Sequence, residues 1–206
     1  MTLQRVNVNF VSGRRVGFES AKAYEARIAS GFWDRYVTGD NVVDVGYRGG
    51  IPDALPICEG ALGVELGDLG YDGLRLPVLD GWAHAVYASH ILEHVFPPED
   101  YLREWFRATR VGGHVIILVP SAFLYERRLT VPPSRWSPEH LFSVTPATLL
   151  DMVERALEPN SYRIRHLADN DAGYDYALPP SIHPTGCLEI ELVLQKIKKP
   201  TWNVES

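Results

Sequence analysis

Four apolar runs alternate with segments of mixed polarity along the first 120 residues. They are VVDV at 42–45, ALGVEL at 61–66, AHAVYA at 83–88 and HVIILVP at 114–120. Short continuous apolar runs are typical of strands that are buried on both faces of a parallel sheet. The pattern therefore predicts four buried strands in this part of the chain.

The segment before the first run has helical periodicity. Within residues 19–37, Tyr24, Ile28, Phe32 and Tyr36 lie four apart and so share one face of a helix. We expect one N-terminal helix whose aromatic face covers the core. The alternative is that the same face also forms a lid over a ligand site.

Two further helices have clear sequence boundaries. One begins at Pro98, which fits the first helical turn, and we expect it to end at the glycine pair 112–113. The other spans 145–157, with Thr145 as N-cap and Pro146 at the first helical position. Both helices carry an apolar stripe that can pack on a sheet.

Two closing strands are predicted at 161–167 and 187–197. The second alternates apolar residues with Glu189, Glu191 and Gln195, the period of a strand with one wet face. The alternation of strands and helices predicts an α/β, Rossmann-like fold. We expect a largely parallel sheet with flanking helices and an antiparallel C-terminal strand.

Composition limits the functions that such a fold could serve. The 206 residues suit one domain, and the net charge of −6 comes without a block of lysine and arginine, which argues against nucleic-acid binding. No apolar run is long enough for a membrane span. Cys58 and Cys187 have no metal-type spacing. These features predict a cytoplasmic protein with a small-molecule partner and no metal.

Polar and glycine-rich residues follow the predicted strands, where open α/β sheets bind ligands. A glycine-rich turn at 46–50 follows the first strand, and Glu65 ends the second, about 20 residues beyond Asp44. A carboxylate at that separation can accept both hydrogen bonds of a ribose diol. The sequence thus predicts a ligand that contains adenosine.

The chain resembles the class I S-adenosylmethionine-dependent methyltransferases between Asn41 and Pro120. The resemblance rests on VVDVGYRGG, GVEL, LPVLDGWAHAVYASHILEHV and LREWFRATRVGGHVIILVP. It implies S-adenosylmethionine as cofactor, with the ribose on Glu65. The cofactor residues that it implies are Asp44, Gly46, Tyr47, Arg48, Gly49, Glu65, Asp72, Ala88 and Ser89. For Asp72, in GYDG, a simple turn is an equally good interpretation.

Three features depart from the family pattern. Arg48 replaces the middle glycine of the turn; its guanidinium could bind the cofactor carboxylate or point outward to solvent. Only about seven residues separate Glu65 from Asp72, so we expect the third strand to be reduced or missing. Pro52 and Pro56 predict a short or irregular helix after the turn.

Methyl transfer to a hydroxyl needs a base, and histidine suits that role near neutral pH. The candidate catalytic residues are His90, His94 and His140, each with a structural role as the alternative. Tyr125, Trp136 and Tyr176 are candidates for acceptor binding, since aromatic faces near carboxylates suit a sugar. They equally suit a packed cover or a contact between two copies of the chain in a homodimer.

The resemblance organises the chain as a single methyltransferase domain over 1–206. Residues 1–40 form a helical cover, 41–120 the cofactor-binding core, and 121–206 the acceptor-side segments and closing strands. The predicted function is O-methylation of a small polar acceptor, such as a sugar or glycan precursor, and the segment PEHLFSVTPATLL resembles members of that type. The alternatives are a non-catalytic binding protein with an altered cofactor turn and a nicotinamide-dependent oxidoreductase.

Overall fold

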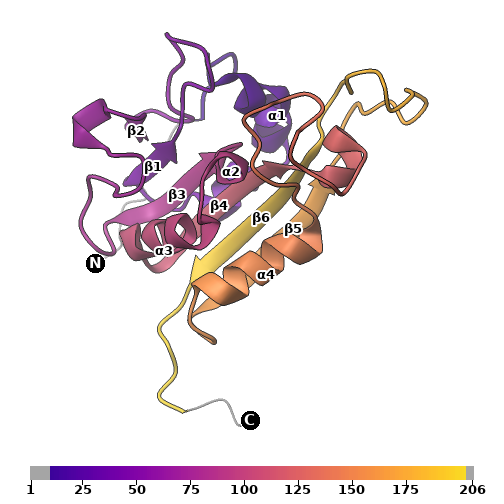
Figure 1. Ribbon diagram of the computed structural model, residues 1–206. Coiled ribbons are helices and arrows are strands. Elements are labelled where there is room, and N and C mark those ends of the chain that lie inside the picture. The colour runs from indigo at the N-terminus through magenta and orange to yellow at the C-terminus, as the bar shows by residue number, and fades with distance from the viewer. Residues whose placement is uncertain (1–9, 203–206) are drawn as a thin grey trace.

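The computed structural model describes residues 10–202, which form a central sheet with helices on both faces (Figure 1). The helices and strands follow one another in the order α1 (Phe18–Ala29), α2 (Phe32–Tyr36), β1 (Val42–Val45), β2 (Leu62–Val64), β3 (Ala83–Ser89), α3 (Pro98–Ala108), β4 (Thr109–Pro120), α4 (Pro146–Ala156), β5 (Tyr162–Asn170) and β6 (Glu189–Lys196). Short helical turns occur at η1 (Asp68–Gly70), η2 (Leu92–His94) and η3 (Ala122–Glu126). No described helix is long and apolar enough to cross a membrane.

The sheet has six strands in the order β2-β1-β3-β4-β6-β5. The strands β1 to β4 run parallel, and β6 is antiparallel to both β4 and β5. This arrangement confirms the predicted α/β fold with an antiparallel C-terminal strand. Within residues 10–202, β2 is the edge strand and nothing pairs on its outer side, which confirms that the usual third strand is missing.

The core consists of two apolar layers, one on each face of the sheet. On one face, α3 and α4 pack Trp105 and Leu149 against sheet residues that include Val86 and Ile117. On the other face, α1 and α2 pack aromatic side chains against the sheet, among them Trp33, which is 1% exposed. Burial of apolar surface in these layers stabilises the sheet and holds the carboxyl ends of its parallel strands in place.

The N-terminal helix is broken, so the prediction of one continuous helix over 19–37 is wrong. Gly31 has a φ of +68°, a left-handed conformation that ends α1 and starts α2 in a new direction. The break lets Phe32 and Trp33 reach the sheet beside Tyr24. The aromatic face does cover the core, as predicted. Residues 46–61 contain no helix, so the short or irregular helix expected after the turn is absent and its prolines leave an irregular connection.

The helix α3 ends at Ala108, four residues before the predicted stop, because the glycine pair 112–113 belongs to β4. A Cβ on Gly113 would lie 2.7 Å from the backbone oxygen of His84, so this glycine permits a close approach of β3. The Nζ atom of Lys196 donates to the backbone oxygens of Phe106 and Thr109 and thereby satisfies the end of the helix. By contrast, α4 begins as predicted, with Thr145 and Thr148 forming a capping box.

The predicted wet face of β6 is buried. Glu189 and Glu191 are 3% and 8% exposed and lie under α1, where the Arg27 guanidinium forms ion pairs with both carboxylates. Arg27 itself is 3% exposed. The alternation of apolar and charged residues predicted that this face is exposed to solvent. The alternation shows which side of the strand carries the carboxylates, but it cannot show that a buried cation from another element neutralises them.

Candidate active site

A cavity of about 990 Å³ lies at the carboxyl ends of the parallel strands. Its wall includes Gly46 and Gly49 after β1, Glu65 after β2, Ser89 and His90 after β3, and the first turn of α1. This is the edge of the sheet at which α/β proteins bind ligands. The first turn of α1 contributes Phe18, Glu19 and Ser20, so the N-terminal helix borders the cavity as well as covering the core.

The turn after β1 accommodates Arg48 without left-handed backbone strain. Gly46, Gly49 and Gly50 have φ values of +68°, +49° and +77°, whereas Arg48 is not among the described residues with positive φ. The three glycines therefore occupy the positions that need conformational freedom. The segment is also closely packed, because a Cβ on Gly17 at the start of α1 would lie 2.6 Å from the backbone oxygen of Tyr47.

The Arg48 side chain turns away from the cavity. Its Nη2 atom donates to Asp68 Oδ2 at 3.1 Å, and the guanidinium lies 5.0 Å from the Tyr47 ring centroid. Neither Tyr47 nor Arg48 lines the cavity. Of the two interpretations of Arg48, the geometry therefore favours the outward-pointing one, with the backbone of the turn rather than the guanidinium available to a ligand.

Glu65 lies in the cavity wall directly after β2. One of its carboxylate oxygens, Oε1, accepts the Arg48 backbone N–H at 2.7 Å, which ties the two predicted cofactor segments together. A carboxylate oxygen has more than one lone pair, so this hydrogen bond leaves acceptors for the two hydroxyls of a ribose. These acceptor oxygens thus fit the ribose hydroxyls of the predicted cofactor.

The other predicted carboxylates have structural partners. Asp44 is 2% exposed, does not line the cavity, and accepts the Ile57 backbone N–H at 2.8 Å. Burial raises the pKa of Asp44 to about 8. Asp72 does line the cavity, and it also accepts the N–H groups of Leu74 and Arg75, which lower its pKa. Its position is compatible with both interpretations given from the sequence.

Ala88 and Ser89 end β3 beside the cavity. Ser89 lines the cavity, and its Oγ is buried without a hydrogen-bond partner among residues 10–202. Ala88 is buried behind this wall and does not line the cavity. A buried hydroxyl without a partner is costly, so Ser89 Oγ is a polar group that a ligand could satisfy.

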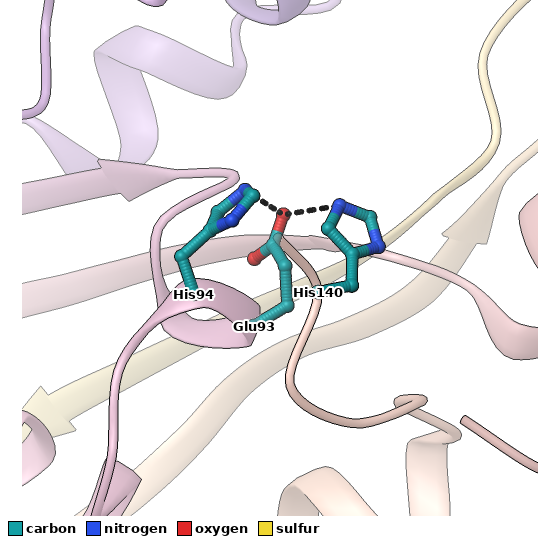
Figure 2. A group of neighbouring side chains, drawn as sticks. All are labelled: Glu93, His94 and His140. Atoms are coloured by element: carbon teal, nitrogen blue, oxygen red, sulfur yellow. Dashed lines mark ion pairs between the residues drawn. The ribbon is translucent and has the colours of Figure 1, made fainter. Parts of the chain in front are cut away.

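The three predicted histidines converge on one buried acid, Glu93. The Oε1 atom of Glu93 lies 3.6 Å from His90 Nδ1, 3.6 Å from His94 Nε2 and 3.9 Å from His140 Nε2. Figure 2 shows Glu93 between His94 and His140, with ion pairs drawn to both. All four residues line the cavity. Residues that are 50 positions apart in the chain thus form one cluster.

The histidines of the cluster differ in their electrostatic surroundings. Burial alone would lower the pKa of His90, but its hydrogen bond to Glu189 and the charge of Glu93 outweigh burial and raise it. Burial and, to a smaller extent, the neighbouring His94 lower the pKa of His140 to about 4. Burial raises the pKa of Glu93. At neutral pH, His140 is therefore a neutral imidazole.

The three aromatic candidates for acceptor binding lie in different places. Tyr125 lines the cavity, with its ring 5.3 Å from the His140 ring. Trp136 packs behind it and donates from Nε1 to the Tyr125 backbone oxygen at 3.0 Å. Tyr176 is 70% exposed, donates to Asp171 Oδ2 and does not line the cavity. The geometry brings only Tyr125 to the site.

Glu93 is the site residue that the sequence interpretation missed. The signal was present in HILEH, where the spacing of His90, Glu93 and His94 matches one helical face. An acid inside the apolar segment ILEHVF also invites a search for its partner. Tyr71 and Glu19 also line the cavity and were not predicted; neither belongs to a recognisable motif.

A family model described as a methyltransferase domain matches residues 64–117, from β2 into β4. This segment includes His90, His94 and the helix α3, and it excludes the glycine turn. No curated protein matches the chain in sequence.

Solved structures extend the similarity to nearly the whole chain. A putative methyltransferase from Bacillus halodurans is 13% identical with a TM-score of 0.56, and the match covers 84% of this chain and all of that one. An S-adenosylmethionine-dependent methyltransferase from Archaeoglobus fulgidus is 17% identical with a TM-score of 0.51, covering 87% and 98%. The [4+2]-cyclase SpnF is 14% identical with a TM-score of 0.54, covering 92% and 89%. The chain thus contains a segment that matches methyltransferase domains and has the overall fold of S-adenosylmethionine-dependent methyltransferases.

Proposed function

We propose that this protein is an enzyme that transfers the methyl group of S-adenosylmethionine to a hydroxyl of a small polar acceptor, such as a sugar or glycan precursor. The observation that carries the proposal is the continuity of one cavity, which joins Glu65 at the end of β2 to the cluster of Glu93, His94 and His140. The residues proposed for the ribose and those proposed for proton removal therefore line one cavity.

S-adenosylmethionine, when bound, supplies a methyl group on a sulfonium with a good leaving group. The chain has to hold the cofactor, orient the acceptor and exclude water. Glu65 and the backbone of the glycine turn bind the adenosine end. Ser89 offers an unpaired hydroxyl to the same ligand. The first turn of α1 closes the side of the cavity above the turn.

Acceptor size and charge follow from the cavity and the composition. At about 990 Å³ the cavity is at the upper end of the roughly 300–1,000 Å³ usual for small-molecule sites, which suits a cofactor together with a small acceptor. The net charge of −6 disfavours a polyanionic acceptor such as nucleic acid. Tyr125 offers an aromatic face beside the histidines, a suitable platform for a sugar ring.

We assign removal of the acceptor proton to the cluster of Glu93, His94 and His140. His140 is neutral at pH 7 and can accept a hydrogen bond from a hydroxyl. His90 is less suited, because its ring is held by Glu189 at 3.2 Å and its pKa is raised. General-base catalysis of this kind contributes roughly two to four orders of magnitude in rate.

The non-catalytic alternative had its support in Arg48 and in the shortened centre of the chain. The unstrained turn weakens the first support, whereas the second remains, because β2 is the edge strand within the described residues. The [4+2]-cyclase among the structural neighbours nevertheless shows that this fold also serves proteins named for another reaction. A catalytic test is therefore necessary in addition to a binding test.

Calorimetric titration with S-adenosylmethionine and S-adenosylhomocysteine tests the cofactor half of the proposal. Glu65→Ala should weaken binding by about 1–3 kcal/mol, the usual cost of losing hydrogen bonds to a charged group. Glu65→Gln keeps an acceptor for the Arg48 N–H and separates ligand binding from support of the turn. Glu59→Ala, an exposed acid outside the cavity, is the matched control. Unchanged affinity in Glu65→Ala would remove Glu65 from the site.

The catalytic half is tested by formation of S-adenosylhomocysteine with a panel of sugars and other polyhydroxylated acceptors. We expect turnover that falls at least tenfold in His140→Ala. Tight cofactor binding without turnover on any acceptor class would favour the non-catalytic alternative.

A further inference from the structure

Glu93, His94 and His140 present three ligand atoms to one point in the cavity wall. One carboxylate oxygen and one nitrogen from each imidazole lie within 4.8 Å of one another. The two imidazole nitrogens are 3.6 and 3.9 Å from Glu93 Oε1. Ligands about 2.1 Å from a tetrahedral metal ion stand roughly 3.4 Å apart, so small side-chain rotations would bring these atoms to ligand distance.

The carboxylate at the centre of this group lies near three imidazoles, His90 included at 3.6 Å, but makes no hydrogen bond with any described residue. Glu93 is fully buried, and neither of its oxygens accepts a hydrogen bond from any residue in 10–202. A buried carboxylate without hydrogen bonds is among the most costly groups in a protein interior. In Figure 2 the carboxylate lies between the two imidazoles, as a shared ligand of a bound ion would.

The far side of each imidazole is also arranged as in metal sites. His94 Nδ1 lies 3.2 Å from the backbone oxygen of Glu139, so its N–H can donate there and leave Nε2 free as a ligand. His140 Nδ1 lies 3.8 Å from the buried carboxylate of Glu126. Metal-binding histidines commonly direct their second nitrogen to a carbonyl or a carboxylate, which fixes the tautomer and the ring orientation.

We infer that Glu93, His94 and His140 form a binding site for a divalent transition-metal ion, with an open coordination position facing the cavity. Two imidazoles and one carboxylate are a ligand set that zinc accepts in catalytic sites, where a water or substrate oxygen takes the fourth position. Imidazole ligands favour zinc over magnesium, which prefers oxygen ligands and keeps its waters. The spacing of the cysteines gave no indication of this site, because it contains no cysteine.

The catalytic role of the ion rests on the proposed function, whereas binding of the ion to these three residues does not. A metal ion at this position could bind the acceptor hydroxyl and lower its pKa, so that the oxygen reaches the methyl group as a better nucleophile. The released proton would pass to water. With the ion bound, His94 and His140 serve as its ligands and not as bases, so activation of the acceptor hydroxyl passes from His140 to the ion at the same cluster.

The test is titration of the chelator-treated full chain with zinc chloride, followed by calorimetry. We expect one site with a Kd at or below the micromolar range and at least 100-fold weaker binding of magnesium chloride. His140→Ala and His94→Ala should each weaken zinc binding at least tenfold. His183→Ala, an exposed histidine outside the cavity, should leave it unchanged. His94 has a 30% exposed side chain, so its removal tests the site if His140→Ala fails to fold.

Titration of the same preparations with S-adenosylhomocysteine separates the two proposals. Absence of zinc binding in a protein that binds S-adenosylhomocysteine would overturn the metal site and leave the proposed function standing. Zinc binding without any affinity for the cofactor would support the site and overturn the proposed function. Zinc affinity that is equal in the wild type, His94→Ala and His140→Ala would also overturn the site.

Discussion

Replacing Arg27 with methionine should remove the only cation that Glu189 and Glu191 share beneath α1 within the described residues. Arg27 donates from Nη2 to Glu191 Oε1 at 2.8 Å and from Nε to the same oxygen at 3.1 Å, and its Nη2 also donates to Glu189. Methionine keeps much of the apolar stem and removes the charge. The carboxylates would then remain buried without a guanidinium beside them.

The expected loss of stability is about 3–5 kcal/mol, the cost of removing one partner of a buried ion pair. The lower end of that range is favoured, because Glu189 still accepts from Asn170 at 2.8 Å and Glu191 still contacts His166 at 2.9 Å. Native domains have only about 5–15 kcal/mol of stability, so the change is large. Urea unfolding at pH 7, with the linear extrapolation, measures it directly.

The effect should depend on pH in a defined direction. Burial alone would raise the pKa of Glu189, but His90, Arg27 and Asn170 together lower it to about 2. A carboxylate with a lowered folded pKa contributes stability above its unfolded value, near 4.3, and loses it as the pH falls toward 2. The difference between wild type and Arg27→Met should therefore shrink below about pH 4.

The matched control is Arg155→Met, which breaks ion pairs with Asp151 and Glu99. The Arg155 side chain is 53% exposed, so this change should cost less than about 1 kcal/mol. Adding Glu189→Gln and Glu191→Gln to Arg27→Met should recover part of the loss, since it removes the stranded charges. A loss in Arg27→Met no larger than that in Arg155→Met would refute the reasoning.

Two further predictions concern the turn after β1. Arg48→Ala should leave the affinity for S-adenosylhomocysteine within about twofold and stability within about 1 kcal/mol, because its partner Asp68 lies outside the cavity and the ion pair is half-exposed. A tenfold loss of affinity in calorimetry would show that the guanidinium contacts the ligand. Asp44 has a raised pKa of about 8, so ionising it costs the wild type stability as the pH rises from about 4 to 8. Asp44→Asn removes that cost. The stability of the variant relative to wild type should therefore increase by up to about 1.4 kcal/mol per pH unit across this window. A stability difference in urea unfolding that stays constant from pH 5 to pH 8 would contradict the raised pKa.

Local signals in the sequence were sufficient for much of the fold. The apolar runs identified β1 to β4, and the capping sequence at Thr145 placed the start of α4, because strands and helix ends depend mainly on nearby residues. The short interval from Glu65 to Asp72 was enough to predict a missing strand. The predictions at Gly31 and at the glycine pair 112–113 were wrong. A glycine alone does not show whether it breaks a helix, ends a helix or allows another strand to approach closely.

The site was only partly accessible in this way. The loops after each strand could be assigned to one edge of the sheet, and Glu65, Ser89 and His140 do meet there. The sequence could not show that Glu93 lies within 4 Å of three histidines, because His140 comes from a different part of the chain. The sequence also could not show that Arg27 neutralises the carboxylates of β6, because this contact depends on how α1 packs on the sheet.

The absence of the third strand also affects how copies of this chain can meet. Among residues 10–202 the sheet ends at β2, which has only three residues and so offers few backbone groups for pairing with another chain. The opposite edge, β5, is longer and carries the exposed charges of Arg163 and Arg165. The shortness of β2 and the charges on β5 both disfavour pairing of these edges with another chain.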